Sequence, residues 1–275
     1  MSLEAAMERL FKVEKPVVGV VHLPPLPGSP RYGGSMAEVL EKALRDARAL
    51  VEGGVNGLVV ENFNDTPFYP RRVPPVTVAA MTKVAAMIRE EFPEVPLGIN
   101  VLRNDALSAM SIAYVVGARF IRVNVLTEVA VAPEGLLVGE AHELLRLKRS
   151  LGANVAIMAD VDVKHAKPLV GRSISSVARD AVERGGADAI IVTGEATGSP
   201  ASLSKVLEVK RAVGKVPVFV GSGINAENAS KFLEACDGLI VGTYFKEGGI
   251  IGRPVDVDRV KRLMAIVSKY RRELS

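Results

Sequence analysis

The sequence predicts an α/β fold, namely a (β/α)8 TIM barrel with a short N-terminal helix. Short apolar runs rich in β-branched residues alternate with longer helical patterns along the whole chain, and eight such pairs can be counted. The length of 275 residues suits one barrel. No Ser/Gly-rich linker or block of charge divides the chain, so we expect residues 1–275 to form one domain.

The first predicted element is a short amphipathic helix within residues 1–15. Glu4, Glu8 and Glu14 lie among its apolar residues, a pattern unlike the apolar core of a signal peptide. Elsewhere no stretch approaches the ~20 apolar residues that a membrane span requires. We therefore expect a cytoplasmic protein without a membrane span.

The predicted strands are mostly continuous apolar runs, as expected of parallel strands that are covered on both faces. They comprise residues 17–22, 57–61, 97–101, 120–124, 154–160, 189–193, 216–221 and 238–242. A pattern with apolar residues three to four apart follows each strand and predicts a helix. The clearest helices cover residues 36–51, 76–91, 141–150, 177–184, 202–213 and 257–271. Residues suited to N-caps precede several helices, namely Ser35, Asp105, Ser202, Asn225 and Asp256.

The main rival fold is an open, doubly wound sheet. That fold typically has a Gly-rich turn after its first strand, where backbone N–H groups hold a pyrophosphate. Here the first strand is followed by the proline-rich residues 24–30 (PPLPGSP), and proline has no N–H to donate. The sequence therefore favours the closed barrel.

Composition excludes several classes of protein. Lysine and arginine number 35 against 31 aspartates and glutamates, and this net charge of +4 is scattered, so we expect no nucleic-acid partner. The single cysteine, Cys236, excludes an intrachain disulfide and a multi-cysteine zinc site. Glutamine is absent, and depletion of thermolabile side chains is typical of hyperthermophile proteins.

Polar residues gather at the predicted carboxyl ends of the strands, where a barrel places its catalytic groups. This ring comprises His22, Glu61 with Asn62, Asn100, Asn124, Asp160 with Asp162, Thr193, Ser222 and Thr243. The strand interiors are read as apolar, so polarity is concentrated at one edge. We expect the substrate to contact the loops there, at Asn100, Asn124, Thr193 and Thr197.

Two glycine-rich turns predict a phosphate site. Gly221, Ser222 and Gly223 follow the seventh strand, and Gly242 and Thr243 follow the eighth. Glycines let backbone amides approach an anion, and barrels often bind a substrate phosphate at these loops. We therefore expect a small phosphorylated ligand at these turns. The phosphate of flavin mononucleotide (FMN) would suit the same turns, but we favour FMN less as the ligand.

Residues 160–165 hold the densest cluster of reactive side chains. Alternation along an extended strand would place Asp160, Asp162 and Lys164 on one side, where with His165 they would serve in proton transfer. Lys164 would form a Schiff base if its pKa were depressed. Alternatively, Asp160 and Asp162 with a histidine would bind Mg²⁺ or Mn²⁺, or the cluster is only a salt-bridged rim.

His22 and Glu61 complete the predicted catalytic set, since each ends an otherwise apolar strand. Three long loops, residues 23–34, 62–75 and 193–200, would cover the mouth. The loop 62–75 is rich in aromatic and cationic residues. It suits a lid over the site or an interface in a homo-oligomer equally well.

Several of these segments together resemble the BtpA family. They are VGVVHLPPLPGSPRY at residues 18–32, DVDVKH at 160–165, TGEATG at 193–198, GSGI at 221–224 and GTYFKEGG at 242–249. The resemblance implies a TIM-barrel-like fold and points to accumulation of photosystem I. Similar sequences occur in organisms without photosynthesis, so that role is not general.

Three functions are therefore expected in decreasing order. The first is an isomerase, lyase or hydrolase acting on a small phosphorylated metabolite, because ionisable groups line the predicted mouth. The second is a non-catalytic assembly or regulatory factor that uses the barrel as a binding platform. The third is an FMN-dependent oxidoreductase.

Overall fold

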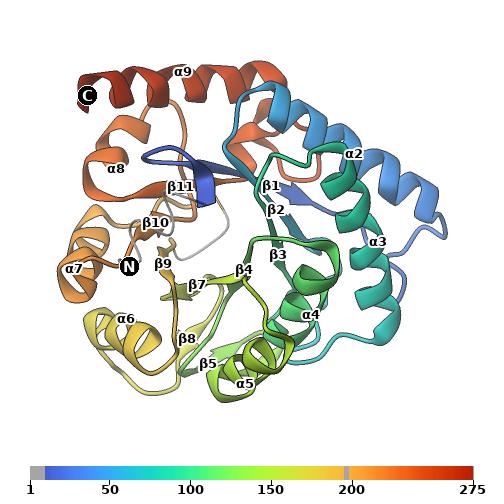
Figure 1. Cartoon of the computed structure of the whole chain (residues 1–275), viewed down its shortest axis with the longest axis horizontal. Coiled ribbons are helices and arrows are strands. Elements are labelled where there is room, and N and C mark those ends of the chain that lie inside the picture. Colours follow the sequence, from blue (N-terminus) through green and yellow to red (C-terminus); the bar gives the residue numbers. More distant parts are fainter. Residues whose placement is uncertain (1–9, 195–197, 275) are drawn as a thin grey trace.

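The computed structural model describes residues 10–194 and 198–274, and Figure 1 shows a barrel of strands inside a ring of helices. Eight parallel strands close in the spatial order β1-β2-β3-β4-β7-β9-β10-β11, with β11 pairing back to β1. The barrel strands are β1 (Val17–His22), β2 (Gly57–Glu61), β3 (Leu97–Asn100), β4 (Phe120–Val123), β7 (Ala156–Val161), β9 (Ala189–Val192), β10 (Val218–Val220) and β11 (Gly238–Val241). The predicted (β/α)8 fold is confirmed, and every strand begins and ends within two residues of its predicted bounds.

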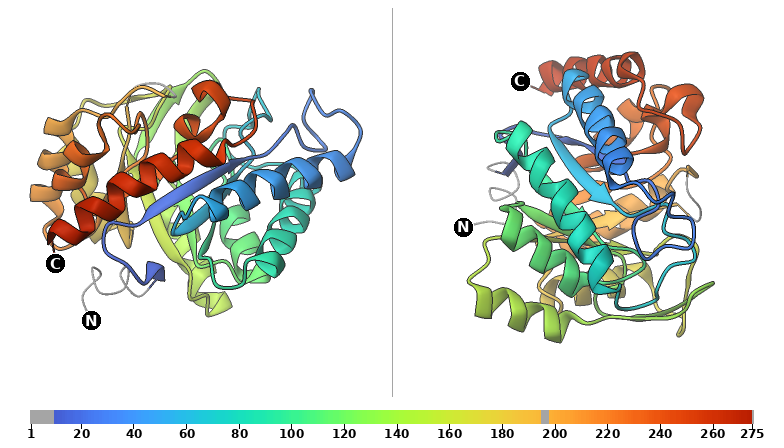
Figure 2. Two further views of the ribbon diagram at one scale, coloured as in Figure 1. Left: turned by 90° about the horizontal axis from the view of Figure 1, so that it is seen from above. Right: turned by 90° about the vertical axis from the view of Figure 1, so that its right-hand side faces the viewer.

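Within the described residues, eight α-helices cover the outside of the barrel (Figure 2). They are α2 (Met36–Glu52), α3 (Pro75–Glu91), α4 (Ala106–Val116), α5 (Ala141–Leu151), α6 (Ile174–Glu183), α7 (Leu203–Val213), α8 (Ala229–Ala235) and α9 (Val257–Leu274). The caps Ser35 and Asp105 accept hydrogen bonds from backbone N–H groups three residues later, at 3.2 and 3.0 Å. Helix α8 begins later than predicted, since its N-cap is Asn228, while Asn225 caps the turn before it. Of the predicted N-terminal helix, residues 1–9 lie outside the described part of the chain.

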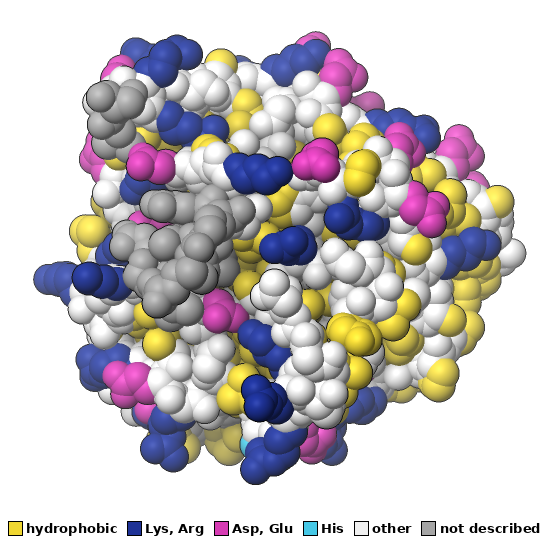
Figure 3. Space-filling model, in the orientation of Figure 1, with side chains coloured by type: hydrophobic (Ala, Val, Ile, Leu, Met, Phe, Trp, Pro, Cys, Tyr) yellow, Lys and Arg dark blue, Asp and Glu magenta, His cyan; other side chains and the backbone are white. Residues whose placement is uncertain are grey.

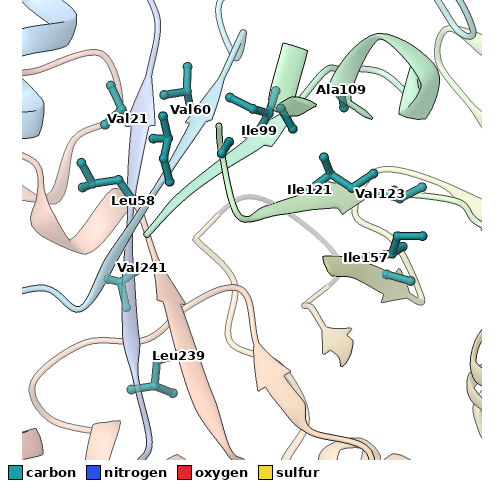
Figure 4. Close-up of a cluster of buried hydrophobic side chains, with 14 of the residues drawn as sticks. Val21, Leu58, Val60, Ile99, Ala109, Ile121, Val123, Ile157, Leu239 and Val241 are labelled. Carbon is teal, nitrogen blue, oxygen red and sulfur yellow. The ribbon is translucent and has the colours of Figure 1, made fainter. Parts of the chain in front are cut away.

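Apolar side chains form two separate layers of core. Figure 4 shows the outer layer, in which Val21, Leu58 and Val60 point from the strands toward the helices. The inner layer fills the barrel, and Phe120 and Phe219 are its largest fully buried members. Packing of these two layers holds the strand ends in place around the mouth.

Glycine makes room for the two inner phenylalanines. A Cβ atom at Gly98 would lie 2.1 Å from the ring of Phe120, and one at Gly238 would lie 2.3 Å from that of Phe219. Phe11 packs against both rings, with centroids 5.7 and 6.1 Å away. The interior is therefore a packed core, and the space open to a ligand lies above it.

A small antiparallel sheet beside the barrel was not predicted. It has the order β6-β5-β8, with β5 (Val129–Ala132), β6 (Gly135–Val138) and β8 (Lys167–Pro168). The hairpin β5–β6 belongs to the loop after β4, and β8 to the loop after β7. These loops are thus tied together at the rim of the barrel.

The surface carries mixed charge. Figure 3 shows Lys and Arg side chains interspersed with Asp and Glu around the visible face. Within the described residues, no helix combines the length and apolar character that crossing a membrane requires.

Candidate active site

At the mouth of the barrel, the last inward-facing residue is polar on five strands, namely β1, β2, β3, β4 and β7. On β1, β4 and β7 the inward positions run from apolar to polar, so that Val20, Phe120 and Met158 lie below His22, Arg122 and Asp160. Glu61 on β2 and Asn100 on β3 occupy the same upper level, since His22 pairs with Glu61 and Glu61 with Asn100 in the strand register. The structure therefore brings the predicted His22, Glu61, Asn100 and Asp160 together.

Arg122 is the centre of the polar layer, and the sequence analysis missed it. Its guanidinium donates to both carboxylate oxygens of Asp160, from Nε at 2.9 Å and from Nη2 at 2.8 Å. Nη1 lies 3.8 Å from the Glu61 carboxylate, which accepts a hydrogen bond from Asn100 at 2.7 Å. Asn124 donates to Asp160 at 3.0 Å. These contacts fix the planes of Glu61 and Asp160 in one network.

The electrostatics of this network keep Arg122 charged. Burial would lower the pKa of Arg122, but Asp160 and then Glu61 outweigh burial and raise that pKa above its ordinary value. The prediction that the strand interiors are apolar is therefore wrong for β4, which contains the buried Arg122. The sequence did carry a sign of this role, because Arg122 stands two residues before Asn124 and strand alternation therefore places both side chains on the inward face.

His22 is held as a neutral imidazole in the wall of the mouth. Its ring packs against Phe63, with centroids 4.7 Å apart, and against Gly242, where a Cβ atom would lie 2.7 Å from His22 Cε1. Burial, followed by the positive charges of Lys246, Lys164 and Arg122, lowers the pKa of His22 well below its usual range. Its buried Nδ1 atom has no hydrogen-bond partner among the described residues.

Lys164 reaches back into the mouth from the loop after β7. Its Nζ atom donates to the backbone carbonyl of Gly221 at 3.1 Å. Burial, followed by repulsion from Arg122, lowers the pKa of Lys164 to about 8. The amine is therefore available both as a proton donor and as a proton acceptor close to neutral pH.

The prediction that Asp160, Asp162 and Lys164 share one side of a strand is wrong. Strand β7 ends at Val161, and Asp162 adopts φ +58°, which turns the chain and breaks the alternation. The Asp162 carboxylate bonds to Lys205 on α7 instead. His165 also leaves the mouth, and with Asp162 it lines a recess beside β5.

The two predicted metal ligands are engaged by cations. Asp160 is bonded to Arg122, and Asp162 to Lys205. Within the described residues no group of three or more His, Cys, Asp or Glu side chains is arranged to hold a metal ion. The carboxylate pair therefore does not form the joint cation site that the sequence suggested.

The two glycine-rich turns line the same cavity as His22, Glu61, Arg122 and Lys164. The empty space of this cavity, including the open solvent at its mouth, is about 790 Å³. All five predicted phosphate-binding residues, Gly221, Ser222, Gly223, Gly242 and Thr243, line it. Among the described residues, no acceptor is bonded to the backbone N–H groups of Gly223, Ile224, Thr243 and Tyr244.

Contacts with neighbouring loops fix the shape of the glycine-rich turn after β10. Gly223 adopts φ +67°, and a Cβ atom there would lie 2.2 Å from Pro200, so only glycine fits. The Ser222 hydroxyl accepts a hydrogen bond from the Gly194 N–H at 2.5 Å. Thr193 donates to the carbonyl of Asp162 at 3.0 Å, whereas Thr197 lies outside the described residues.

Arg259 adds a positive charge to the cavity and was also missed. It is on the first turn of α9, stacks 4.4 Å above the ring centroid of Tyr244 and donates to the Tyr244 carbonyl at 2.6 Å. These contacts hold the guanidinium beside the turn that follows β11. Asp256 caps this helix as predicted and accepts from the Arg259 N–H at 3.3 Å.

The aromatic side chains of the loop 62–75 line two different recesses. Phe63 lines the main cavity, while Phe68 and Tyr69 line a second recess together with residues 28–30. Arg71 and Arg72 both form ion pairs with Glu140 and Glu143 at the start of α5. The cationic half of the loop is therefore anchored within the chain.

Comparison with solved structures agrees with the barrel fold. The chain is similar to 3-hexulose-6-phosphate synthase from Salmonella typhimurium, with a TM-score of 0.59 at 12% identity over 93% of this chain and 99% of the other. It is also similar to N-(5'-phosphoribosyl)anthranilate isomerase from Pyrococcus furiosus, with a TM-score of 0.54 at 17% identity over 93% and 99% of the two chains. At these identities the likeness shows the fold alone.

Comparison of sequences shows the family. The chain is 47% identical to the photosystem I biogenesis protein BtpA of Synechocystis, over 94% of this chain and 90% of the relative. It is 35% identical to a mitochondrial protein of Caenorhabditis elegans, over 99% and 100% of the two chains. The model of the BtpA family matches residues 13–269. The chain therefore belongs to the BtpA family.

Proposed function

We propose that this protein is an enzyme that binds a small phosphorylated metabolite and transfers protons on it, as an isomerase or lyase does. The phosphate lies on the turns after β10 and β11, and His22, Glu61 and Lys164 act on the rest of the molecule. The observation that carries the proposal is that one cavity is lined by both sets of groups.

Phosphate binding is supported by the donors of the two turns. The N–H groups of Gly223, Ile224, Thr243 and Tyr244 lack acceptors among the described residues and line the cavity together with Arg259. Several backbone donors and a guanidinium suit the oxygens of a phosphate. The phosphate of FMN would use the same donors, and that alternative predicts flavin absorbance in protein mixed with FMN.

Proton transfer is supported by the environment of the ionisable groups. His22 stays a neutral imidazole near neutral pH, where it can accept or donate a hydrogen bond to the substrate, whereas Lys164, with a pKa of about 8, exchanges a proton in this range. Glu61 is oriented by Asn100 and Arg122. We assign Asp160 to positioning Arg122, while Asp162 and His165 lie outside the cavity.

The two solved barrels described above carry the names of enzymes that act on phosphorylated compounds, which agrees with the proposal at the level of the fold. The second candidate, a non-catalytic assembly factor, is favoured by the name of the Synechocystis relative. It is also favoured by the exposed apolar face of the small sheet, on which Val131, Leu136 and Val138 are 46–54% exposed. The homo-oligomer stays a prediction.

Phosphate binding is tested with Arg259→Ala and the matched control Arg262→Ala. Arg262 is on the same helix, but it is 68% exposed and pairs with Glu227. Titration of glycerol 3-phosphate, followed by ³¹P NMR, should show binding that Arg259→Ala weakens about tenfold, since a charge-assisted hydrogen bond contributes ~1.5 kcal/mol or more. Equal binding by both variants would contradict the proposed phosphate site.

Catalysis is tested on metabolites that co-purify with the protein and are identified by mass spectrometry. Each is incubated with the protein in D₂O and followed by ¹H NMR. An isomerase or lyase that moves a proton from carbon should introduce deuterium into the substrate. Turnover without deuterium indicates a hydrolase.

If biological activity survives Lys164→Met but is lost on Val131→Asp with Leu136→Asp, the assembly-factor function is correct instead.

A further inference from the structure

We propose that Lys164 is a nucleophile that forms an imine with the carbonyl carbon of a phosphorylated aldehyde or ketone bound at the barrel mouth. This inference rests on the proposed function, because the phosphate on the turns after β10 and β11 brings the carbonyl group to Lys164. It narrows the substrate class from phosphorylated metabolites in general to carbonyl compounds.

The position of the amine is the first argument. Lys164 lines the cavity, and its Nζ atom is bonded to the carbonyl of Gly221 at 3.1 Å. Gly221 is the first residue of the phosphate-binding turn. A small ligand whose phosphate lies on this turn therefore has its next few atoms within reach of the amine.

The lack of an ion pair is the second argument. Among the carboxylates of the described residues, none forms an ion pair with Lys164, since Glu61 is bonded to Asn100 and Asp160 to Arg122. Lys205, on the neighbouring helix α7, is by contrast bonded to Asp162. A lysine bonded only to a neutral carbonyl keeps its nitrogen free to react once it has lost a proton.

The state of the amine supports this reading. With a pKa of about 8 against an ordinary 10.5, about a tenth of the molecules carry a neutral Lys164 amine at pH 7. That fraction is ~300 times the fraction for an ordinary lysine. Glu61 and Asp160 act in the opposite direction, because their charges favour a cation at this nitrogen. They would therefore stabilise the positive imine.

The step balances without an oxidant or a reductant. The ammonium of Lys164 loses one proton to solvent, and the amine nitrogen attacks the carbonyl carbon as the C–O π bond breaks. A second proton passes from nitrogen to oxygen and gives a hydroxyl group. A proton from solvent then adds to this hydroxyl, which leaves as water. One ammonium and one carbonyl thus yield one protonated imine and one water.

Reductive trapping tests the inference. The full chain is mixed with dihydroxyacetone phosphate and sodium borohydride, and peptide mapping by mass spectrometry locates the adduct. We expect the adduct on Lys164, at least about tenfold more than with dihydroxyacetone, and none with glycerol 3-phosphate, which has no carbonyl group. The rate should rise about tenfold from pH 6 to pH 7, because the neutral fraction does.

Variants make the test specific. Lys164→Arg and Lys164→Met should abolish the adduct, with thermal unfolding by circular dichroism showing that each is folded. The matched control Lys205→Arg should retain it, because the amine of Lys205 is held by Asp162. Labelling that spreads over surface lysines and persists in Lys164→Arg would overturn the inference.

Failure of this inference and failure of the proposed function give different results. If glycerol 3-phosphate binds but dihydroxyacetone phosphate leaves no adduct on Lys164, the imine is wrong and the phosphate site stands. If glycerol 3-phosphate does not bind the wild-type protein, the proposed phosphate site is wrong, and with it the preference for a phosphorylated carbonyl compound.

Discussion

A buried ion pair next to the turn after β11 gives the sharpest prediction of stability. Lys246 follows the turn after β11 and is 2% exposed, and its Nζ atom lies 2.6 Å from Asp46 Oδ2 on α2. The other oxygen of Asp46 accepts from the Val255 N–H at 3.1 Å. Asp46→Ala removes both contacts and leaves the Lys246 charge buried without its partner.

The expected magnitude follows from this burial. Breaking one side of a buried ion pair lowers the free energy of unfolding by about 3–5 kcal/mol. At an unfolding entropy of ~2.1 cal/mol/K per residue, a chain of this length should lose roughly 5–9 °C in Tm. Replacing both partners, Asp46→Leu with Lys246→Met, should recover most of the loss because no buried charge remains.

Equilibrium unfolding in guanidinium chloride measures these differences. The matched control is Glu52→Ala, on the same helix, which removes an exposed pair with Lys261 and should change the free energy by under ~1 kcal/mol. A loss of under ~1 kcal/mol for Asp46→Ala, or a double variant less stable than the single one, would refute the argument that the charge is the cause.

Three other predictions concern the site and the lone thiol. Gly223→Ala should lower the free energy of unfolding by about 1–3 kcal/mol and abolish phosphate binding, because the added Cβ atom meets Pro200. The control Gly54→Ala, where the Cβ atom faces open space at φ +93°, should keep binding in the same ³¹P NMR titration. The His22 imidazole should titrate below pH 6.5 by NMR. Since the unfolded chain then takes up this proton first, the free energy of unfolding should fall as the pH drops below about 6.5. A His22→Gln variant should lose the share of this slope that belongs to His22 and keep the share of His165, whose pKa is also lowered, by burial first. Burial raises the pKa of Cys236 to about 12, so a thiol reagent at pH 8 should label it only after denaturant is added, and rapid labelling of the native protein would contradict this.

The barrel was predictable because its signal repeats. Each strand such as Gly57–Glu61 is a short apolar run between helical patterns, and an error of two residues at one end does not change the count. The small sheet gave no such signal. Strands β5 and β6 follow each other within one loop with no helical pattern between them, and β8 has only two residues, so none of them repeats the alternation of strand and helix.

The site was predictable as far as strand alternation holds. His22, Glu61 and Asp160 are inside their strands, and the inward register places them correctly. Asp162 is one residue past the end of β7, where a positive φ that no periodicity reveals sends its side chain to Lys205. Arg259 lies far along the chain on a helix, and only the tertiary fold brings it to the cavity.

The pairing of the first strand with the last has a consequence for synthesis of the chain. β1 carries His22, and the turn after β11 supplies Gly242, against which that imidazole packs. While a ribosome makes the chain, β1 can pair with β2 early. Its other edge stays open until β11, which begins more than 200 residues after the end of β1, has emerged. Ligand binding should therefore be the last property that a nascent chain acquires, and a phosphorylated ligand that is already present would favour closure of the barrel.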